Sequence, residues 1–292
     1  MIINNRHKDR LFIFLFGNEA HKDWTLNLYN AINNSNYDDP EAISFNTLDD
    51  FLYMGMKNDV SFIINGQINL FEHQSTFNPN MPLRQLLYLA HIYEAHVHES
   101  QESLFSPKLL NLPAPKLYVF YNGTEQEDEE KILYLSDSFN GEGDIEAKVR
   151  MVNINYGHNE QLLHTCRQLG EYSWLIAEIR YNTNSQFMSL SEAIDNAIMK
   201  MPENYSIKDV IEKHQVEVKG MLFSEAETEF EMNKLKNQFK REIAEEIAKD
   251  NYEKGREEER ERIKLLLLEK GADKEMIDLI DKSSILKEHT EK

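Results

Sequence analysis

Two acidic residues, Asp59 and Glu72, lie at the outer ends of a segment with the sequence pattern of a β-hairpin. Apolar and polar residues alternate on either side of Gly66, as they do in half-buried strands. If residues 59–65 and 68–75 pair as antiparallel strands, the first acid starts one strand and the second stands near the end of the other. Both carboxylates then lie at the same end of the hairpin, where they can converge.

The residues that follow Glu72 add further oxygen atoms to this pair of acids. Gln74 is expected on the same strand face as Glu72, because side chains two positions apart in a strand point the same way. The backbone carbonyl of His73 can turn toward the same place. Two carboxylates, a carbonyl and water suit a hard cation such as Mg²⁺, which lowers the pKa of bound water and polarises a phosphodiester. The predicted metal ligands are therefore Asp59, Glu72 and His73.

In these residues the chain resembles the PD-(D/E)XK nucleases, and more narrowly their transposase-like, recombination-promoting branch. The signature of that superfamily is an aspartate, a variable spacer and then Glu/Asp-X-Lys. The resemblance lies in several blocks spread over much of the chain: residues 58–62, 72–76, 78–84 and 121–123, together with Tyr88 and Tyr93. The charged helical tail also fits, so the similarity is to an arrangement and not to one short motif.

The resemblance implies a catalytic role for three residues of the hairpin. Asp59 and Glu72 would bind Mg²⁺, with Mn²⁺ as an alternative cofactor, and the His73 carbonyl would complete the protein ligands. Gln74 stands where the family has lysine. An amide can orient water by hydrogen bonding, but it cannot deprotonate it or supply a full positive charge. Activity is therefore expected to be slow or to depend on activation.

Two further site residues follow from the same resemblance. Many members use an additional acid from the first helix, and Asp9 is the first candidate here, ahead of Glu19 and Asp23. Arg84 is the candidate substrate-binding residue, because its positive charge could bind phosphate in place of the missing lysine. An equal alternative is that Arg84 anchors the loop before it to the following helix. Tyr88 is expected to pack rather than to stack on bases.

Hydrophobic periodicity predicts the elements that position these residues. Two short helices are expected near the N-terminus, and a helix from Pro82 to about Val97, because proline suits the first turn of a helix. Residues 116–121 form an apolar run typical of a buried strand, and the acidic stretch 125–130 is expected to be a solvated loop. The remaining predictions are a strand over 149–154 and helices over 159–180 and 190–201.

This order of elements, together with the resemblance, predicts an α/β fold. The expected core, over residues 1–220, is restriction-endonuclease-like, with a mixed central sheet flanked by helices. Residues 221–292 are predicted to form a charged helical tail that Gly255 and Gly271 divide. The tail could bind a protein partner or a second copy of the chain, face DNA as an arm, or form a loosely structured helix. Its acid excess makes direct DNA contact the least attractive of the three. Its apolar stripe favours packing against another element: Met232, Leu235, Phe239, Ile243 and Ile247.

Composition limits the possible functions. The net charge of −19, from 51 acidic and 32 basic residues, argues against a broad basic surface that coats nucleic acid. A nuclease would instead need a local basic face, a metal or a partner. Cys166 is the only cysteine, which excludes an intramolecular disulfide and favours a buried apolar role. No signal peptide or membrane span is recognisable, so a cytoplasmic location away from membranes is expected.

The function expected from the sequence is a magnesium-dependent DNA endonuclease that hydrolyses phosphodiester bonds, in recombination, transposition or defence. The alternative is a catalytically weakened member of the same fold that binds nucleic acid or a protein partner. A third hypothesis has RNA as the substrate, although the sequence contains no recognisable reader of the 2′-hydroxyl.

Overall fold

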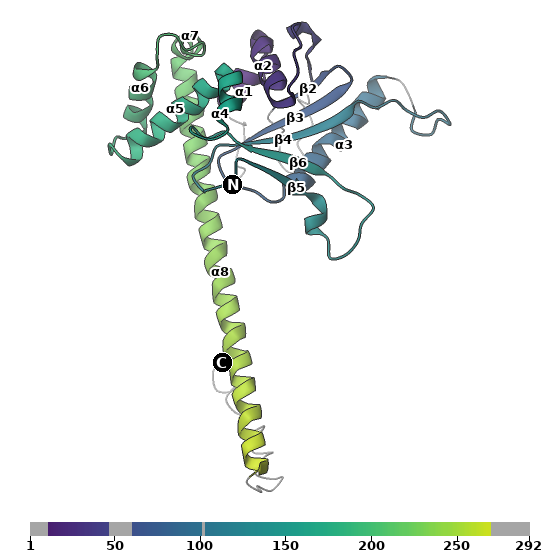
Figure 1. Ribbon diagram of the computed structural model, residues 1–292, viewed down its shortest axis with the longest axis vertical. Coiled ribbons are helices and arrows are strands. Elements are labelled where there is room, and N and C mark those ends of the chain that lie inside the picture. The colour runs from purple at the N-terminus through teal and green to yellow at the C-terminus, as the bar shows by residue number, and fades with distance from the viewer. Residues whose placement is uncertain (1–10, 47–59, 101–102, 270–292) are drawn as a thin grey trace, which may run out of the picture. The chain divides into compact units, whose positions relative to one another are not determined.

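The computed structural model describes residues 11–46, 60–100 and 103–269. Its chain divides into two compact units, Met1–Phe230 and Glu231–Lys292. The first unit holds an open six-stranded sheet with helices on both faces, so the predicted α/β class is confirmed (Figure 1). Among the described helices, none combines the length and the apolar character that crossing a membrane requires.

The sheet is mixed and has the strand order β1-β2-β3-β4-β6-β5. Its first three strands form an antiparallel meander, β3, β4 and β6 run parallel, and β5 returns antiparallel to β6. Their bounds are β1 Ser44–Phe45, β2 Val60–Ile64, β3 Gln67–Gln74, β4 Ala114–Tyr121, β5 Glu130–Tyr134 and β6 Lys148–Asn153. The predicted hairpin is thus confirmed over the residues that the structure describes.

Alternate residues of β3 face two different helical layers. Ile68 and Leu70 pack against Tyr88, Leu89 and other residues of α3 (Met81–Glu99). Phe71 belongs instead to the large core cluster on the other face. That cluster contains residues of α1 (Leu11–Phe16), α2 (Lys22–Asn33) and α5 (Arg167–Asn184). Figure 1 shows α3 on one side of the sheet and α1 and α2 on the other.

Helix α3 forms the crossover between β3 and β4, because parallel strands cannot be joined by a hairpin turn. It begins at Met81 with Pro82 in its first turn, as predicted, and continues to Glu99. On its inner face, the Gln85 side chain donates a hydrogen bond of 2.8 Å to the carbonyl of Tyr118 in β4. The start of α3 is thereby fixed over the end of β3 that carries Glu72.

The single helix predicted over residues 159–180 is two helices in the structure. α4 (Glu160–Thr165) ends at Cys166, and α5 begins at Arg167. Close packing at Gly170 accompanies the break, because a Cβ atom there would collide with the Leu163 carbonyl. Helical periodicity persists across the break and gave no sign of it. The predicted helix over 190–201 is confirmed as α6 (Leu190–Lys200), which Ser189 and Glu192 start with a capping box.

The predicted loop in the acidic stretch is correct as far as Glu129, but the strand β5 that follows was not predicted. Four of its five residues are exposed, so its hydrophobic pattern is weak. It pairs with β6 and completes one edge of the sheet.

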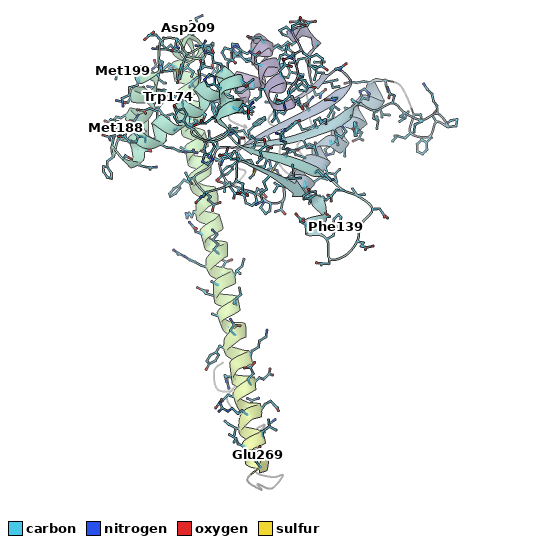
Figure 2. The ribbon with its side chains drawn as sticks, in the orientation of Figure 1. Phe139, Trp174, Met188, Met199, Asp209 and Glu269 are labelled. Carbon is cyan, nitrogen blue, oxygen red and sulfur yellow. The ribbon has the colours of Figure 1, made fainter. Side chains whose placement is uncertain are left out.

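Helices α7 (Lys208–Lys213) and α8 (Gln215–Glu269) end the described chain. α8 begins before the change in composition near Met221, and its buried residues Val218, Met221 and Leu222 belong to the first unit. Gly255 lies inside this helix, so the prediction that it divides the tail is wrong. From Phe230 onward the side chains whose exposure is described are mostly exposed, and Figure 2 draws them along the helix.

Candidate functional site

Glu72 is the predicted site residue with the most distinctive environment. It lies near the end of β3, where only 2% of its side chain is exposed. Its Oε1 accepts a hydrogen bond of 2.5 Å from Nη2 of Arg84, in the first turn of α3. A buried carboxylate needs such a partner, because desolvating its charge is costly. Arg84 therefore neutralises the acid that was predicted to bind a metal.

Gln74 faces the same side of the sheet as Glu72, as predicted. Its Nε2 lies 2.6 Å from Sδ of Met81, the first residue of α3. Its Oε1 is buried and makes no hydrogen bond within the described part of the chain. Buried amide oxygens usually have a donor or a ligand. This oxygen is thus available to a cation or to water beside Glu72.

The side chain of His73 lies on the opposite face of the sheet. Its Nε2 is 2.9 Å from the hydroxyl of Tyr172 in α5, and its ring stacks on Phe12 with centroids 5.2 Å apart. Only its backbone carbonyl was predicted to reach the metal. The carbonyl of Gln74 accepts a hydrogen bond from the N–H of Asn122 beyond β4. Because successive carbonyls of a strand point in opposite directions, that of His73 points toward the β2 side.

Asp59 and Asp9 lie outside the described residues. Of the two reserve candidates, Glu19 pairs with Lys22 at 2.9 Å, and Asp23 stands exposed in the first turn of α2. Both belong to the layer opposite Glu72, so the structure does not bring them to it. Within residues 11–46, 60–100 and 103–269, no group of three or more His, Cys, Asp or Glu side chains could hold a metal ion.

The ends of the parallel strands carry a second polar group that sequence reasoning missed. Arg180 in α5 donates hydrogen bonds to the side-chain oxygen of Asn122 at 2.8 Å and to its carbonyl at 2.6 Å. It also donates one to Asn155 at 3.2 Å. Asn122 follows β4 directly, and its own N–H binds Gln74. The only sequence signal was the Tyr121-Asn122-Gly123 strand end, which gives no indication of the arginine.

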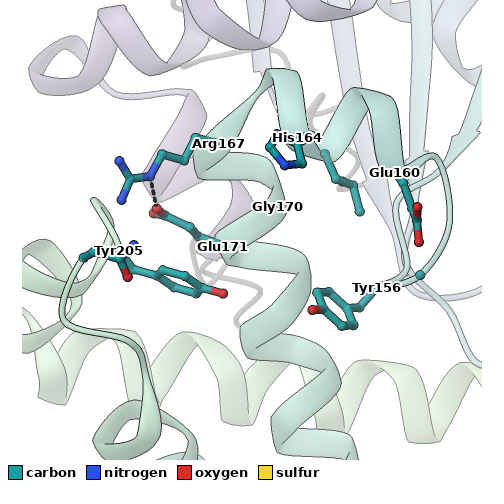
Figure 3. Close-up of a pocket in the computed structure, with 10 residues that line it drawn as sticks. Tyr156, Glu160, His164, Arg167, Gly170, Glu171 and Tyr205 are labelled. Atoms are coloured by element: carbon teal, nitrogen blue, oxygen red, sulfur yellow. Dashed lines mark hydrogen bonds and ion pairs between the residues drawn. The ribbon is translucent and has the colours of Figure 1, made fainter.

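A pocket of about 570 Å³ lies where α4 and α5 meet the segment before α7 (Figure 3). Nε of Arg167 donates a hydrogen bond of 2.7 Å to the buried Glu171, and the rings of Tyr156 and Tyr205 line the pocket. The second oxygen of Glu171 accepts bonds from the hydroxyl of Ser206 and the N–H of Ile207. Through these hydrogen bonds Glu171 ties α5 to the segment that precedes α7.

Comparison with known proteins adds no family assignment. Family models, curated proteins and solved structures all gave no significant match to the chain. The proposed activity therefore depends on the residues and on their positions in the fold.

Proposed function

We propose that the chain is a magnesium-dependent DNA endonuclease with a restriction-endonuclease-like core, in which Asp59 and Glu72 hold the metal. The order of elements supports the proposal, because a mixed sheet flanked by helices carries Glu72 at a strand end. DNA recombination, transposition or defence is the setting in which such an enzyme would act.

The register of the hairpin is the observation that carries this proposal. β2 and β3 pair antiparallel, with Val60 opposite Phe71. Continuing that register by one residue would set Asp59 opposite Glu72. Directly opposed residues of antiparallel strands project from the same face, with Cβ atoms about 4.5 to 5.5 Å apart. At that separation two carboxylates can share one cation.

The described residues fit a hard cation at this position. Glu72 offers a carboxylate and Gln74 a buried amide oxygen without a hydrogen bond, and both project from the α3 face of β3. Oxygen ligands of this kind are those that Mg²⁺ prefers. Asp59 would add the second carboxylate, and the His73 carbonyl would point toward the same edge. Mg²⁺ would supply an activated water and polarise the phosphodiester.

The other side chains of the site would position the substrate. Gln74 would orient the attacking water through its amide, since it carries no charge with which to stabilise the transition state. Arg84 would supply that charge from the start of α3, where its guanidinium already contacts Glu72. It would then divide its hydrogen bonds between the carboxylate and a phosphate oxygen. The water would attack the phosphorus atom, and the bond between phosphorus and the sugar 3′ oxygen would break, so that this oxygen departs.

A nicking assay on supercoiled plasmid tests the proposal. Purified full chain is incubated with Mg²⁺, and the variants Asp59→Asn and Glu72→Gln are compared with it. Each substitution removes one charge with little change of shape, so nicking is expected to fall ~100-fold or more. Glu94→Gln is the matched control, because Glu94 is an exposed acid on the same helix as Arg84. Equal nicking by all four proteins would refute the nuclease assignment.

Two observations favour a second candidate, a catalytically weakened protein that binds nucleic acid or another protein. Arg84 already neutralises Glu72, and Gln74 supplies no charge. Gln74→Lys separates the candidates, because restoring the cation should increase nicking if the site binds metal and substrate. A protein that binds DNA but nicks it neither before nor after this substitution is the weakened form. The same assay on RNA of matched sequence identifies the substrate.

A further inference from the structure

A second pocket, of about 560 Å³, lies between the C-terminal end of α2 and the strands β4, β5 and β6. It includes Tyr118, which pairs with Phe71 and packs in the core on the face opposite Glu72. The pocket is therefore separate from the proposed active site. Of its lining residues within the described part of the chain, three are charged, and all three are cations: Lys116, Lys148 and Arg150.

The floor of this pocket is fixed by hydrogen bonds. Nε and Nη2 of Arg150 donate to the two carboxylate oxygens of Glu130, at 3.1 and 2.6 Å, and Nη1 donates to the carbonyl of Ile32 at 3.1 Å. The hydroxyl of Tyr118 donates to the Asn33 side chain at 2.7 Å. These bonds join α2 to β4 and β6, so the floor is preorganised. Since Glu130 neutralises Arg150, the role of the arginine is structural.

The two lysines supply the charge that remains. Neither Lys116 nor Lys148 forms an ion pair in the described part of the chain, and both are exposed. Lys148 also lies 5.7 Å from the centroid of the Tyr134 ring, which lines the same pocket. Among the residues that the structure describes, no carboxylate lines the pocket, and Glu130, which lies next to it, is paired with Arg150, although the chain carries a net charge of −19. Salt screens the distant acids beyond about 8 to 10 Å, so the local field favours an anion.

We propose that this pocket binds a nucleotide. Lys116 and Lys148 would contact the phosphate, and the base would lie against the partly exposed rim formed by Tyr134 and Ile132. The volume is in the range of about 300 to 1,000 Å³ that small-molecule sites occupy. Aromatic rings accept any base face by stacking, whereas lysines recognise only the charge. The ligand is either a free nucleotide or the terminal nucleotide of a strand, since both present the same chemistry.

Equilibrium binding to the full chain tests this proposal, with a chelator present so that metal-dependent cleavage plays no part. The probes are adenosine, adenosine monophosphate, inorganic phosphate, and a tetranucleotide with or without a terminal phosphate. Adenosine monophosphate should bind more tightly than adenosine or phosphate alone. The double variant Lys116→Glu, Lys148→Glu should weaken its binding ~10-fold or more, because repulsion replaces two attractive contacts. Tyr134→Ala should weaken the binding of adenosine monophosphate but leave the binding of inorganic phosphate unchanged.

Lys213→Glu is the matched control, because Lys213 is an exposed lysine outside the pocket. Thermal unfolding of each variant verifies that it is folded.

Tighter binding of the phosphorylated tetranucleotide than of the mononucleotide identifies a strand end as the ligand, and equal or weaker binding identifies a free nucleotide. The proposal is overturned if adenosine binds as well as its monophosphate, if Lys213→Glu weakens binding as much as the double variant, or if millimolar probe does not bind. Because no metal is present, these outcomes are independent of the nicking assay.

Discussion

At the scale of single residues, strand periodicity predicted which side chains share a face, but not what they contact. Glu72 and Gln74 were placed on one face of β3 because a strand repeats every two residues. The partner of Glu72 could not be predicted, since the reach of Arg84 depends on how α3 crosses the sheet. The position of Arg180 beside Asn122 depends in the same way on the packing of α5. Contacts between a helix and the sheet depend on how the two pack in three dimensions, and the local sequence pattern does not predict that packing.

The pair formed by Arg84 and Glu72 yields the first prediction. Arg84→Ala removes the guanidinium that pairs with Glu72, whose side chain is only 2% exposed. The substitution should lower the unfolding free energy by about 2 to 3 kcal/mol, a value reduced for solvent screening because Arg84 is itself 24% exposed. If the site binds metal, Mg²⁺ should recover part of this loss by binding Glu72 in the folded state. Denaturant unfolding with and without Mg²⁺ measures both effects. The variant Arg84→Ala, Glu72→Gln should show no recovery, and recovery there would place the Mg²⁺ elsewhere.

Cys166 is expected to be inert while the protein is folded. It is fully buried, and this burial raises the pKa of its thiol from 9.0 to about 12. The folded state therefore binds the thiol proton more tightly than the unfolded state does. The protonated thiol stabilises the fold fully below its unfolded pKa of 9.0, and this stabilisation is lost as the pH rises from 9.0 through about 12. At about pH 8, a disulfide reagent should label the native chain no faster than it unfolds. Release of the coloured thiolate measures the rate, and rapid labelling before unfolding would contradict the described burial.

At the scale of elements, the predictions that succeeded depended on long periodic patterns. The β2–β3 hairpin, α3 with Pro82 in its first turn, and α6 were all placed from such patterns. The interruption at Cys166 was missed because helical spacing continues through it. β5 was missed because its exposed side chains do not alternate, and its partner β6 lies elsewhere in the sequence. Boundaries that depend on tertiary packing are the ones that local sequence does not specify.

Substitution by alanine should change the unfolding free energy in opposite directions at two glycines. A Cβ atom at Gly123 would collide with the Ser75 carbonyl and the Tyr121 hydroxyl, and backbone cannot move cheaply. Gly123→Ala should therefore cost about 1 to 3 kcal/mol of unfolding free energy. Gly220 lies in α8 with open space around its Cβ position, so Gly220→Ala should add about 0.5 to 1 kcal/mol through helix propensity. Denaturant unfolding measures both changes: stabilisation by Gly123→Ala would refute the described packing at Gly123, and destabilisation by Gly220→Ala would contradict the open space described at Gly220.

At the scale of the whole molecule, the chain has two units, and their boundary does not follow composition. The sequence becomes strongly charged near Met221, which led to the predicted division at residue 220. The compact units of the structure meet after Phe230, and α8 runs through both positions without interruption. The first turns of α8 bury Val218, Met221 and Leu222 before the exposed stretch begins. A helix can thus belong to a core at one end while its composition already resembles that of a tail.

The burial of side chains in the first turns of α8 predicts the outcome of two truncations. A chain that ends at residue 230 keeps the buried side chains of α8, so its sheet unit should unfold at nearly the same denaturant concentration as in the full chain. A chain that ends at residue 220 loses Met221 and Leu222, each 5% exposed, and should be less stable by roughly 3 to 6 kcal/mol. Circular dichroism at increasing urea compares the two. The variant Met221→Ala, Leu222→Ala in the full chain separates lost burial from lost helix, because it should reproduce most of the destabilisation while α8 remains. Equal midpoints for the two truncated chains would mean that these side chains contribute nothing to the core.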